Sequence, residues 1–585
     1  MALPDRLGHL SPEERSLLFE RLRRRKEEAR PVADARARGI SRRDGTGPAP
    51  LSFAQQRLWF LDRLAPGEPG YNVPVAVLIE GPLDRVALDR ALKAVIARHE
   101  SLRTTFELRE GSPVQIVASC GALSFPVIDL EGWGGDGSRE LERICGEVVH
   151  LSFDLSTGPL LRAVLLRQGA ERHALILVLH HIVSDGWSTG VLVSDLSALY
   201  GGEALPPLPI QYADFAVWQR GWLQGERLEE QLAVWRKRLE GVPELLALPT
   251  DRPRPPVKSS AGACAPCSIA AEPGTRAQAL ARDEGVSLFM VLLAAFQAVL
   301  HRWSGQERFA VGTVVANRNR PELESLIGFF VNTLPLGADL EGDPTVGDLL
   351  RSVREVALEA FAHQDVPFER LVEELRPERD PGRSPIFQVS LSLQNTPPPR
   401  AGFGNLALRA LEVPPRHVKF DLELSWEPGE RGEVRGVFLY STALFDAATV
   451  ERMSGHFRAT FQGLLEGRGR RLSELPLLTP EEVAQLEAWN QDGVPRRISP
   501  PEDLFAALAA AAPEAPAVVT TAGVLTRGAL DTQAWRLAHR LRELGVGPEV
   551  PVGVLLPRSA DLVLAALAIA RSGGVYLPLD PADPA

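Results

Sequence analysis

Cysteine is scarce in this chain. Four cysteines among 585 residues cannot form a disulfide framework, so the sequence predicts a protein of a reducing compartment, and we expect a cytoplasmic location. Cys264 and Cys267 form a CxxC pair, but no second pair and no nearby histidine completes a zinc site. We therefore expect no metal at this pair.

Long apolar runs are also missing. Gln297 and His301 interrupt the most apolar stretch, residues 288–303, which fits a buried helix better than a membrane span. The charged, periodic start "LSPEERSLLFERL" contains a capping box of Ser11 and Glu14 and does not look like a secretory signal. The sequence predicts a protein that has no membrane partner.

An excess of positive charge is the third absence. The net charge is −11, so the chain as a whole does not offer the phosphate-neutralising surface of a nucleic-acid-binding protein. The basic cluster at residues 21–26 is followed at once by Glu27 and Glu28, and we interpret it as a solvated helix face. We expect no nucleic-acid partner.

Glycine and proline, by contrast, are plentiful, with 50 and 48 residues. Proline-rich joints lie at residues 205–210, 248–260, 395–404 and 490–503. Between them strand-like runs alternate with helix-like ones, as in "PVAVLIEGPL" followed by "DRVALDRALKAVIARHE", and this alternation predicts a mixed α/β architecture. The length predicts about three or four compact units.

Two adjacent histidines form the most informative motif, "LVLHHIVSDGWSTG". The apolar run 174–179 predicts a buried strand that ends at His180 and His181, and Ser188 is placed to cap the helix that follows. The motif therefore occupies a strand-to-helix turn, where side chains and backbone N–H groups converge on ligands. Because successive strand residues point to opposite faces, only one of the two rings can face a given cavity.

These residues alone leave three interpretations open. In the first, both histidines are structural and Asp185 is a turn residue before Gly186. In the second, His181 and Asp185 bind a metal, although no third ligand stands at a recognisable spacing. In the third, one imidazole moves a proton near neutral pH while Asp185 holds the loop through a buried ion pair.

Six further segments accompany the histidine motif in a fixed order. The seven are "LSFAQQRLWFLDRL" (51–64), "RHESLRTTF" (98–106), "LHHIVSDGWS" (179–188), "QYADFAVWQR" (211–220), "IGFFVNTLPL" (327–336), "HQDVPFERLV" (363–372) and "RDPGRSPIFQ" (379–388). Together they resemble the motif set of the condensation domains of nonribosomal peptide synthetases. The segment after residue 503 resembles the start of an adenylation domain, without the Gly-rich phosphate loop that adenylation needs.

The resemblance implies an α/β (α+β) fold of two chloramphenicol-acetyltransferase-like lobes, arranged as a V with a tunnel between them. It implies five divisions: an N-terminal helix and linker (1–49), an N-lobe (50–228), a C-lobe (229–478), a linker (479–503) and a truncated adenylation domain in cis (504–585). Upstream and downstream carrier domains would deliver donor and acceptor on 4′-phosphopantetheine. The chain itself would then bind no cofactor and no metal.

The implied reaction is attack of an acceptor α-amine on a donor thioester, which forms an amide bond. His181 would be the active-site histidine, either as general base or as a positioning group. Asp185 would be structural and paired with an arginine, for which we choose Arg103 first and Arg57 second. Gly186 would leave room for the donor thioester, with its N–H near a helix start.

Further residues are expected to support the site without reacting. His180 and Ser188 would orient the loop. Trp187 and Asn332 are candidates for the tunnel wall, although Asn332 is equally suited to bond a strand edge. Several aromatic residues of the motifs are expected in the core or the tunnel wall: Trp59, Tyr212, Phe215, Trp218 and Phe329.

The same motifs help to distinguish a condensation domain from related domains of the superfamily. The intact histidine pair argues against a heterocyclisation domain, and the absence of a Glu-Gly-His-Gly-Arg-Glu motif argues against an epimerisation domain. The motif favours an L-configured donor, but a starter domain that accepts a fatty acyl group and a non-catalytic recruiting platform stay open. The predicted helix 11–29, with an apolar stripe, either docks an upstream partner or packs on its own domain.

Overall fold

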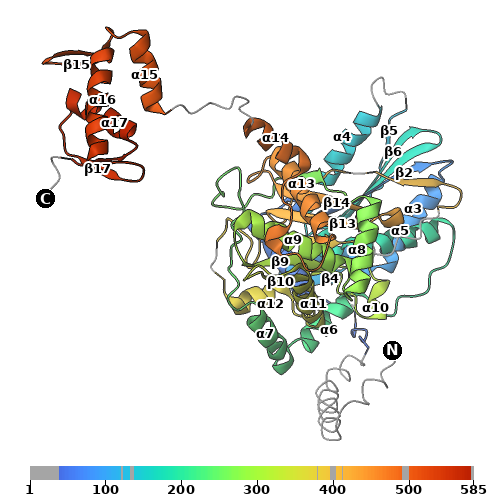
Figure 1. Cartoon of the computed structure of the whole chain (residues 1–585). Coiled ribbons are helices and arrows are strands. Elements are labelled where there is room, and N and C mark those ends of the chain that lie inside the picture. The colour runs from blue at the N-terminus through green and yellow to red at the C-terminus, as the bar shows by residue number, and fades with distance from the viewer. Residues whose placement is uncertain are drawn as a thin grey trace, which may run out of the picture. The chain divides into compact units, whose positions relative to one another are not determined.

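The computed structural model describes residues 39–580, apart from residues 46, 120–122, 132–136, 378–379, 395–402, 412 and 491–499. The predicted helix 11–29 and its docking role lie outside the described residues, as does most of the joint at 490–503. The chain divides into two compact units, Met1–Glu482 and Val483–Ala585 (Figure 1).

The first half of the larger unit is built around a five-stranded sheet in the order β12-β2-β7-β6-β5. Its own strands are β2 (Asn72–Glu80), β5 (Val127–Asp129), β6 (Leu161–Gly169) and β7 (Arg172–His180). Helices α3 (Arg85–Arg98) and α5 (Gly186–Tyr200) cover one face, and α4 (Gly137–His150) covers the other. Residues 173–180 of β7 are all buried, so the predicted two-sided burial of this strand is confirmed.

A small three-stranded sheet and several helices complete this half. The strands are β1 (Ala49–Pro50), β3 (Thr104–Arg109) and β4 (Ser112–Val117), and the helices are α2 (Phe53–Leu64) and α6 (Tyr212–Trp222). Helix α7 (Glu226–Arg238) follows and packs into the core of the second half. The 3₁₀ turns of the unit are η2 (Pro69–Tyr71), η3 (Glu100–Arg103), η4 (His181–Val183), η5 (Glu430–Gly432) and η6 (Leu472–Glu474). A capping box between Ser52 and Gln55 starts α2, which packs against η4 and so reaches the histidine motif.

The second half carries a six-stranded sheet in the order β10-β9-β11-β13-β14-β8. The strands are β8 (Gly262–Pro266), β9 (Arg308–Val315), β10 (Asn332–Asp339), β11 (Val389–Leu393), β13 (Leu422–Pro428) and β14 (Val434–Ser441). The helices are α8 (Ala271–Asp283), α9 (Leu288–Ser304), α10 (Pro321–Glu324), α11 (Val346–Ala362), α12 (Phe368–Leu375) and α13 (Ala447–Leu464). Every residue of α9 from Met290 to Leu300 is buried, which confirms the predicted core helix.

One strand crosses from the second half to the first. β12 (Ala407–Ala410) pairs antiparallel with β2, placing Ala407 opposite Glu80 and Ala410 opposite Val77. Phe403, just before this strand, is 4% exposed and its ring centroid lies 5.1 Å from that of Tyr200 in α5. The two halves therefore share a sheet as well as an interface.

The smaller unit consists of helices and two short sheets. Its elements are α15 (Pro501–Ala511), β15 (Pro516–Thr520), β16 (Gly523–Thr526), α16 (Arg527–Glu543), β17 (Pro551–Val554), α17 (Ala560–Ser572) and β18 (Val575–Pro578). Helix α14 (Pro480–Asn490) spans the boundary between the units. Arg571 of α17 forms an ion pair with Asp531 of α16, which joins the two longest helices of this unit.

Within the described ranges, no helix by itself is long and apolar enough to span a membrane. Helices α8 and α9 together reach the required length and composition, but they are bent by 106° where they meet.

Candidate active site

The histidine motif lies where β7 ends and α5 begins. Asp185 is the N-cap of α5, because its Oδ1 accepts the N–H of Ser188 at 2.8 Å. The helix therefore starts at Gly186, and the predicted role of Ser188 as the cap is wrong: Ser188 is the third helical residue and donates to the cap. The negative charge of this carboxylate also interacts favourably with the positive end of the helix dipole.

His181 is held in one tautomer by the turn that follows it. Its Nδ1 lies 2.7 Å from Ser184 O, and because a carbonyl oxygen only accepts, Nδ1 carries the proton and Nε2 keeps its lone pair. The ring packs edge-on against Phe329, with centroids 4.8 Å apart. Burial holds the pKa of His181 well below its ordinary value of 6.5, and the positive charge of Lys419 lowers it further. The imidazole is therefore neutral at physiological pH.

His180 has different surroundings. It is 4% exposed, its Nδ1 accepts the N–H of Ile182 at 3.2 Å, and its ring packs near those of Phe153 and Tyr71. Burial lowers the pKa of His180 to about 4. This ring packs inside the core and fixes the start of η4.

Acidification is expected to weaken the fold through His180. The unfolded chain takes up this proton near pH 6.5 and the folded chain only near its lowered pKa of about 4, so stability is present above pH 6.5 and is lost as the pH falls between these values. The loss at pH 5 is about 2 kcal/mol. Urea unfolding at pH 7 and pH 5 is expected to show a smaller loss in His180→Gln than in the wild type, and equal losses would contradict the assignment.

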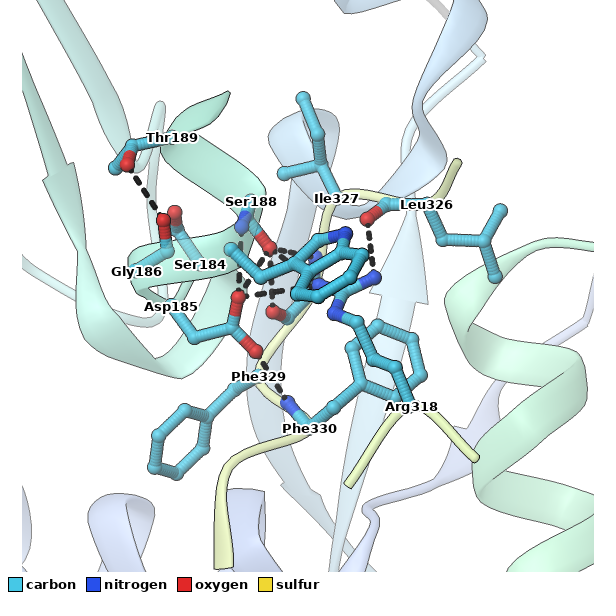
Figure 2. Close-up of polar contacts among 12 residues, drawn as sticks. Ser184, Asp185, Gly186, Ser188, Thr189, Arg318, Leu326, Ile327, Phe329 and Phe330 are labelled. Atoms are coloured by element: carbon cyan, nitrogen blue, oxygen red, sulfur yellow. Dashed lines mark hydrogen bonds and ion pairs between the residues drawn. The ribbon is translucent and has the colours of Figure 1, made fainter. Parts of the chain in front are cut away.

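Asp185 is the centre of a buried hydrogen-bond network (Figure 2). The residue is fully buried, and its Oδ1 accepts from Ser188 Oγ at 2.7 Å and from Arg318 Nη2 at 3.1 Å, while its Oδ2 accepts from Phe330 N at 3.0 Å. Arg318 also donates to Leu326 O at 2.8 Å, and its guanidinium lies 4.2 Å from the centroid of the Phe330 ring. Because donors engage both carboxylate oxygens, the metal interpretation of the motif fails, and Asp185 has a structural role.

The arginine that pairs with Asp185 is Arg318, so the predicted choice of Arg103 or Arg57 is wrong. Arg103 donates to Ala118 O and lies 4.0 Å from Glu100. Arg57, on α2, pairs with Glu369 of α12 at 3.2 Å. Both candidates are thus engaged in other elements, whereas Arg318 follows β9 in the second half of the unit.

The connection between β9 and β10, residues 318–331, joins the second half to the histidine loop; we call it the bridge segment. Ser188 Oγ accepts from Gly328 N at 3.0 Å, Tyr212 Oη donates to Phe329 O at 2.6 Å, and Trp187 Nε1 donates to Glu324 O at 2.9 Å. A Cβ added at Gly328 would lie 1.9 Å from the Tyr212 ring, so this close approach requires glycine. The site is therefore assembled from both halves.

The remaining candidate residues have distinct surroundings. Gly186 is exposed, and no atom lies within 4 Å of the position that a Cβ would occupy. Asn332 is 8% exposed; its Nδ2 donates to Val366 O at 2.7 Å and its Oδ1 accepts from Phe368 N at 3.1 Å. Of its two expected roles, Asn332 therefore performs the bonding one, by holding the loop before α12.

A large cavity opens beside this site. It measures about 1010 Å³ and lies between α2, α12 and three segments of the second half, residues 258–260, 383–385 and 418–420. Its wall includes Tyr71, whose ring centroid is 6.4 Å from that of His180. Gln55 of α2 donates to Ile182 O of η4 at 3.3 Å, which ties the cavity wall to the histidine loop. His181 is not itself part of the lining.

The motif aromatics divide between core and cavity wall. Tyr212 and Phe215 pack with Phe330 in one buried cluster, and Trp59 lines the cavity. In the part of the chain that the structure describes, no three His, Cys, Asp or Glu side chains gather as a metal site.

Residues 46–487 match the family model described as Condensation domain, and residues 505–585 match that of AMP-binding enzyme. One of the linear gramicidin synthase proteins of Brevibacillus parabrevis is 46% identical over 92% of this chain and 7% of its own length. Phosphinothricin tripeptide synthetase PhsC of Streptomyces viridochromogenes is 43% identical over 100% of this chain and 54% of its own. The chain thus spans about half, or far less, of these relatives' lengths.

Among solved structures, the X-domain from teicoplanin biosynthesis is similar, with 28% identity and a TM-score of 0.69 over 75% of this chain and 100% of that one. The predicted fold of two chloramphenicol-acetyltransferase-like lobes is confirmed by such neighbours. Since the first family model covers well over half of the chain, the protein belongs to the condensation-domain family of nonribosomal peptide synthetases, and a short AMP-binding segment follows that domain.

Proposed function

We propose that this protein forms amide bonds, joining an aminoacyl amine on one carrier domain to an acyl or peptidyl thioester on another. Condensation domains are acyltransferases of this kind. The observation that carries the proposal is the neutral His181, whose Nδ1 proton is fixed by Ser184 O at 2.7 Å. Its Nε2 lone pair is thereby available to an incoming amine.

The reaction makes three physical demands. The amine must be neutral, the two carrier-borne ends must meet, and the developing oxyanion must be stabilised. His181 Nε2 serves the first two, either by taking a proton, which is worth about 10²- to 10⁴-fold, or by holding the amine, where orientation supplies roughly 7 to 11 kcal/mol. The backbone N–H of Gly186, the first residue of α5, is a donor that the oxyanion could meet, since the cap formed by Asp185 takes the N–H of Ser188 instead.

Gly186→Trp is expected to lower the rate of amide formation at least tenfold without unfolding the protein. The position is open to solvent and the added Cβ meets no atom within 4 Å, so the fold accommodates the indole while the indole occupies the space that the thioester needs. Gly469 is a matched control, because it is exposed and equally free of neighbours within 4 Å. Equal rates for Gly186→Trp and Gly469→Trp would contradict this role.

The proposed function is tested by reconstitution with loaded carriers. The chain is mixed with a donor carrier and an aminoacyl acceptor carrier, and products are identified by mass spectrometry. A panel of L-aminoacyl, D-aminoacyl and fatty acyl donors is expected to give product best from the L-configured donor. Best product from fatty acyl donors would make it a starter domain, and no product from any donor would overturn the proposal.

The partners and the internal boundaries belong to the same proposal. We infer that donor and acceptor carriers approach from separate sides, and that the lobes divide at residues 228 and 229, within α7. For the predicted helix 11–29, docking to an upstream partner and packing on its own domain both stay open. We also infer a cytoplasmic location, because the described cysteines, Cys145, Cys264 and Cys267, are all free thiols.

Recruitment of another enzyme is the second candidate function. The X-domain of teicoplanin biosynthesis has also been solved in complex with OxyB. A platform of that kind needs no catalytic imidazole, so product formation that depends on His181 separates the two functions.

A further inference from the structure

Six cationic side chains line the large cavity. Three of them come from separate elements: Arg57 from α2, Lys258 from the segment before β8, and Lys419 from the segment before β13. Arg57 is paired with Glu369 at 3.2 Å, and Lys258 Nζ donates to Ser384 Oγ at 2.6 Å. Among the residues that the structure describes, no carboxylate forms an ion pair with Lys419.

The backbone of Lys419 is held from both sides. Its N–H donates to Glu423 Oε1 at 2.8 Å, and its carbonyl oxygen accepts from Lys258 Nζ. The flanking residues Val418 and Phe420 are 5% and 7% exposed. The Lys419 side chain is therefore anchored at its base, and it lines the cavity from an exposed position.

The charged and titratable groups around His181 come from three elements. His180 precedes it on β7 and is uncharged at neutral pH, and the Asp185–Arg318 pair in the following loop neutralises itself at 3.1 Å. Lys419 belongs to the second half of the unit and lines the cavity, and its charge lowers the pKa of His181 in addition to the effect of burial. Burial also lowers the pKa of Lys419, while Glu423 opposes this and supports the ammonium form.

We propose that Lys419 is a positioning residue that holds the incoming α-amine and the His181 imidazole in their neutral, reactive forms. This inference rests on the proposed amide-forming function. A substrate ammonium that enters the cavity beside the histidine loop meets the like charge of Lys419 in its wall, so its proton is released to solvent. The neutral nitrogen then bonds to the thioester carbonyl carbon, the C–S bond breaks, and the second amine proton ends on the pantetheine thiol.

The pH dependence of single-turnover amide formation tests this inference. In Lys419→Gln the acid limb of the rate profile is expected to move to higher pH by about one unit, because the amine then needs a higher pH to lose its proton. The rates of variant and wild type are expected to converge at high pH. Lys419→Arg keeps the charge and is expected to keep the wild-type limb. Lys93→Gln is a matched control, since Lys93 is exposed and pairs with Asp89 at 2.6 Å on α3.

A second measurement does not depend on turnover. The His181 imidazole is titrated by NMR in carrier-free protein, with its signal assigned by its loss in His181→Gln, and its pKa is expected to rise in Lys419→Gln. Thermal unfolding confirms that each variant is folded. If Lys419→Gln does not fold, Lys419→Met takes its place as the variant without the charge.

The outcomes separate the two proposals. No product from the wild type with any donor sinks the proposed function. Product from the wild type, with an unmoved acid limb and an unmoved His181 titration in Lys419→Gln, overturns the role of Lys419 and leaves the function standing.

Discussion

Replacing Asp185 with alanine is expected to lower the free energy of unfolding of the larger unit by about 3 to 5 kcal/mol. The side chains of Asp185 and Arg318 are 0% and 1% exposed, so the variant leaves a guanidinium buried without its counter-charge. It also leaves the N–H groups of Ser188 and Phe330, which now donate to this carboxylate at 2.8 and 3.0 Å, without an acceptor. Urea unfolding followed by circular dichroism at pH 7 measures the loss.

An exposed ion pair supplies the control for this prediction. Asp129 pairs with Arg167 at 2.9 Å, but the two side chains are 55% and 38% exposed. Asp129→Ala is therefore expected to change stability by about 0 to 1 kcal/mol. If Asp185→Ala and Asp129→Ala both lowered the free energy of unfolding by the same small amount, the Asp185 network would not hold the loop.

Loss of activity in Asp185→Ala is expected to follow from the loss of structure. In a double variant, Asp185→Leu with Arg318→Met, no unpaired charge stays buried, so we expect higher stability than in Asp185→Ala. Activity in the double variant stays low if the ion pair also sets the geometry of His181, because the same network ties the bridge segment to the histidine loop.

The sequence predicted those features that depend on local pattern. A continuous apolar run is enough to indicate a strand buried on both faces, and residues 174–179 form one in β7. The apolar stretch at 288–303, interrupted by Gln297 and His301, predicts a core helix, and the structure confirms it: Gln297 is buried in α9 and His301 lies in its last turn. The ordered motifs indicated the family before any geometry was known.

Features that depend on tertiary contacts were not predictable in this way. Arg318 lies 133 residues beyond Asp185, in "ANRNRPELE", which none of the motifs includes. The only local hint is that Arg318 and Arg320 follow a strand and precede a proline-started helix. Helix α5 starts at Gly186 because Asp185 competes successfully with Ser188 for the cap position, a choice that Arg318 and Phe330 stabilise from outside the segment.

The crossing strand illustrates the same limit. β12 is four residues long, and its burial alternates only weakly. Its pairing with β2 is fixed by Phe403 and by the edge that β2 leaves open, and neither can be read from the residues of β12. Short edge strands of this kind are specified by their partners.

Peptide formation is expected to fall about 10²- to 10⁴-fold in His181→Ala if the imidazole acts as a base. His181→Gln distinguishes a general base from a positioning group. The glutamine amide oxygen accepts a hydrogen bond from the amine but takes no proton at neutral pH. A Gln variant close to the wild type indicates positioning, and a Gln variant as slow as Ala indicates proton transfer. Rates are measured in single turnover with both carriers loaded.

A histidine near the start of β7, the strand that ends just before His181, gives a control for His181. His173 begins the buried part of β7 and is 7% exposed, so His173→Ala removes an imidazole from the strand that leads to His181 without touching the histidine loop. We expect the His173 variant to keep its rate while losing some stability, and the His181 variant to lose its rate while staying folded. Wild-type turnover in His181→Ala would show that the site, although it places a neutral imidazole beside a large cavity, does not use that ring in catalysis.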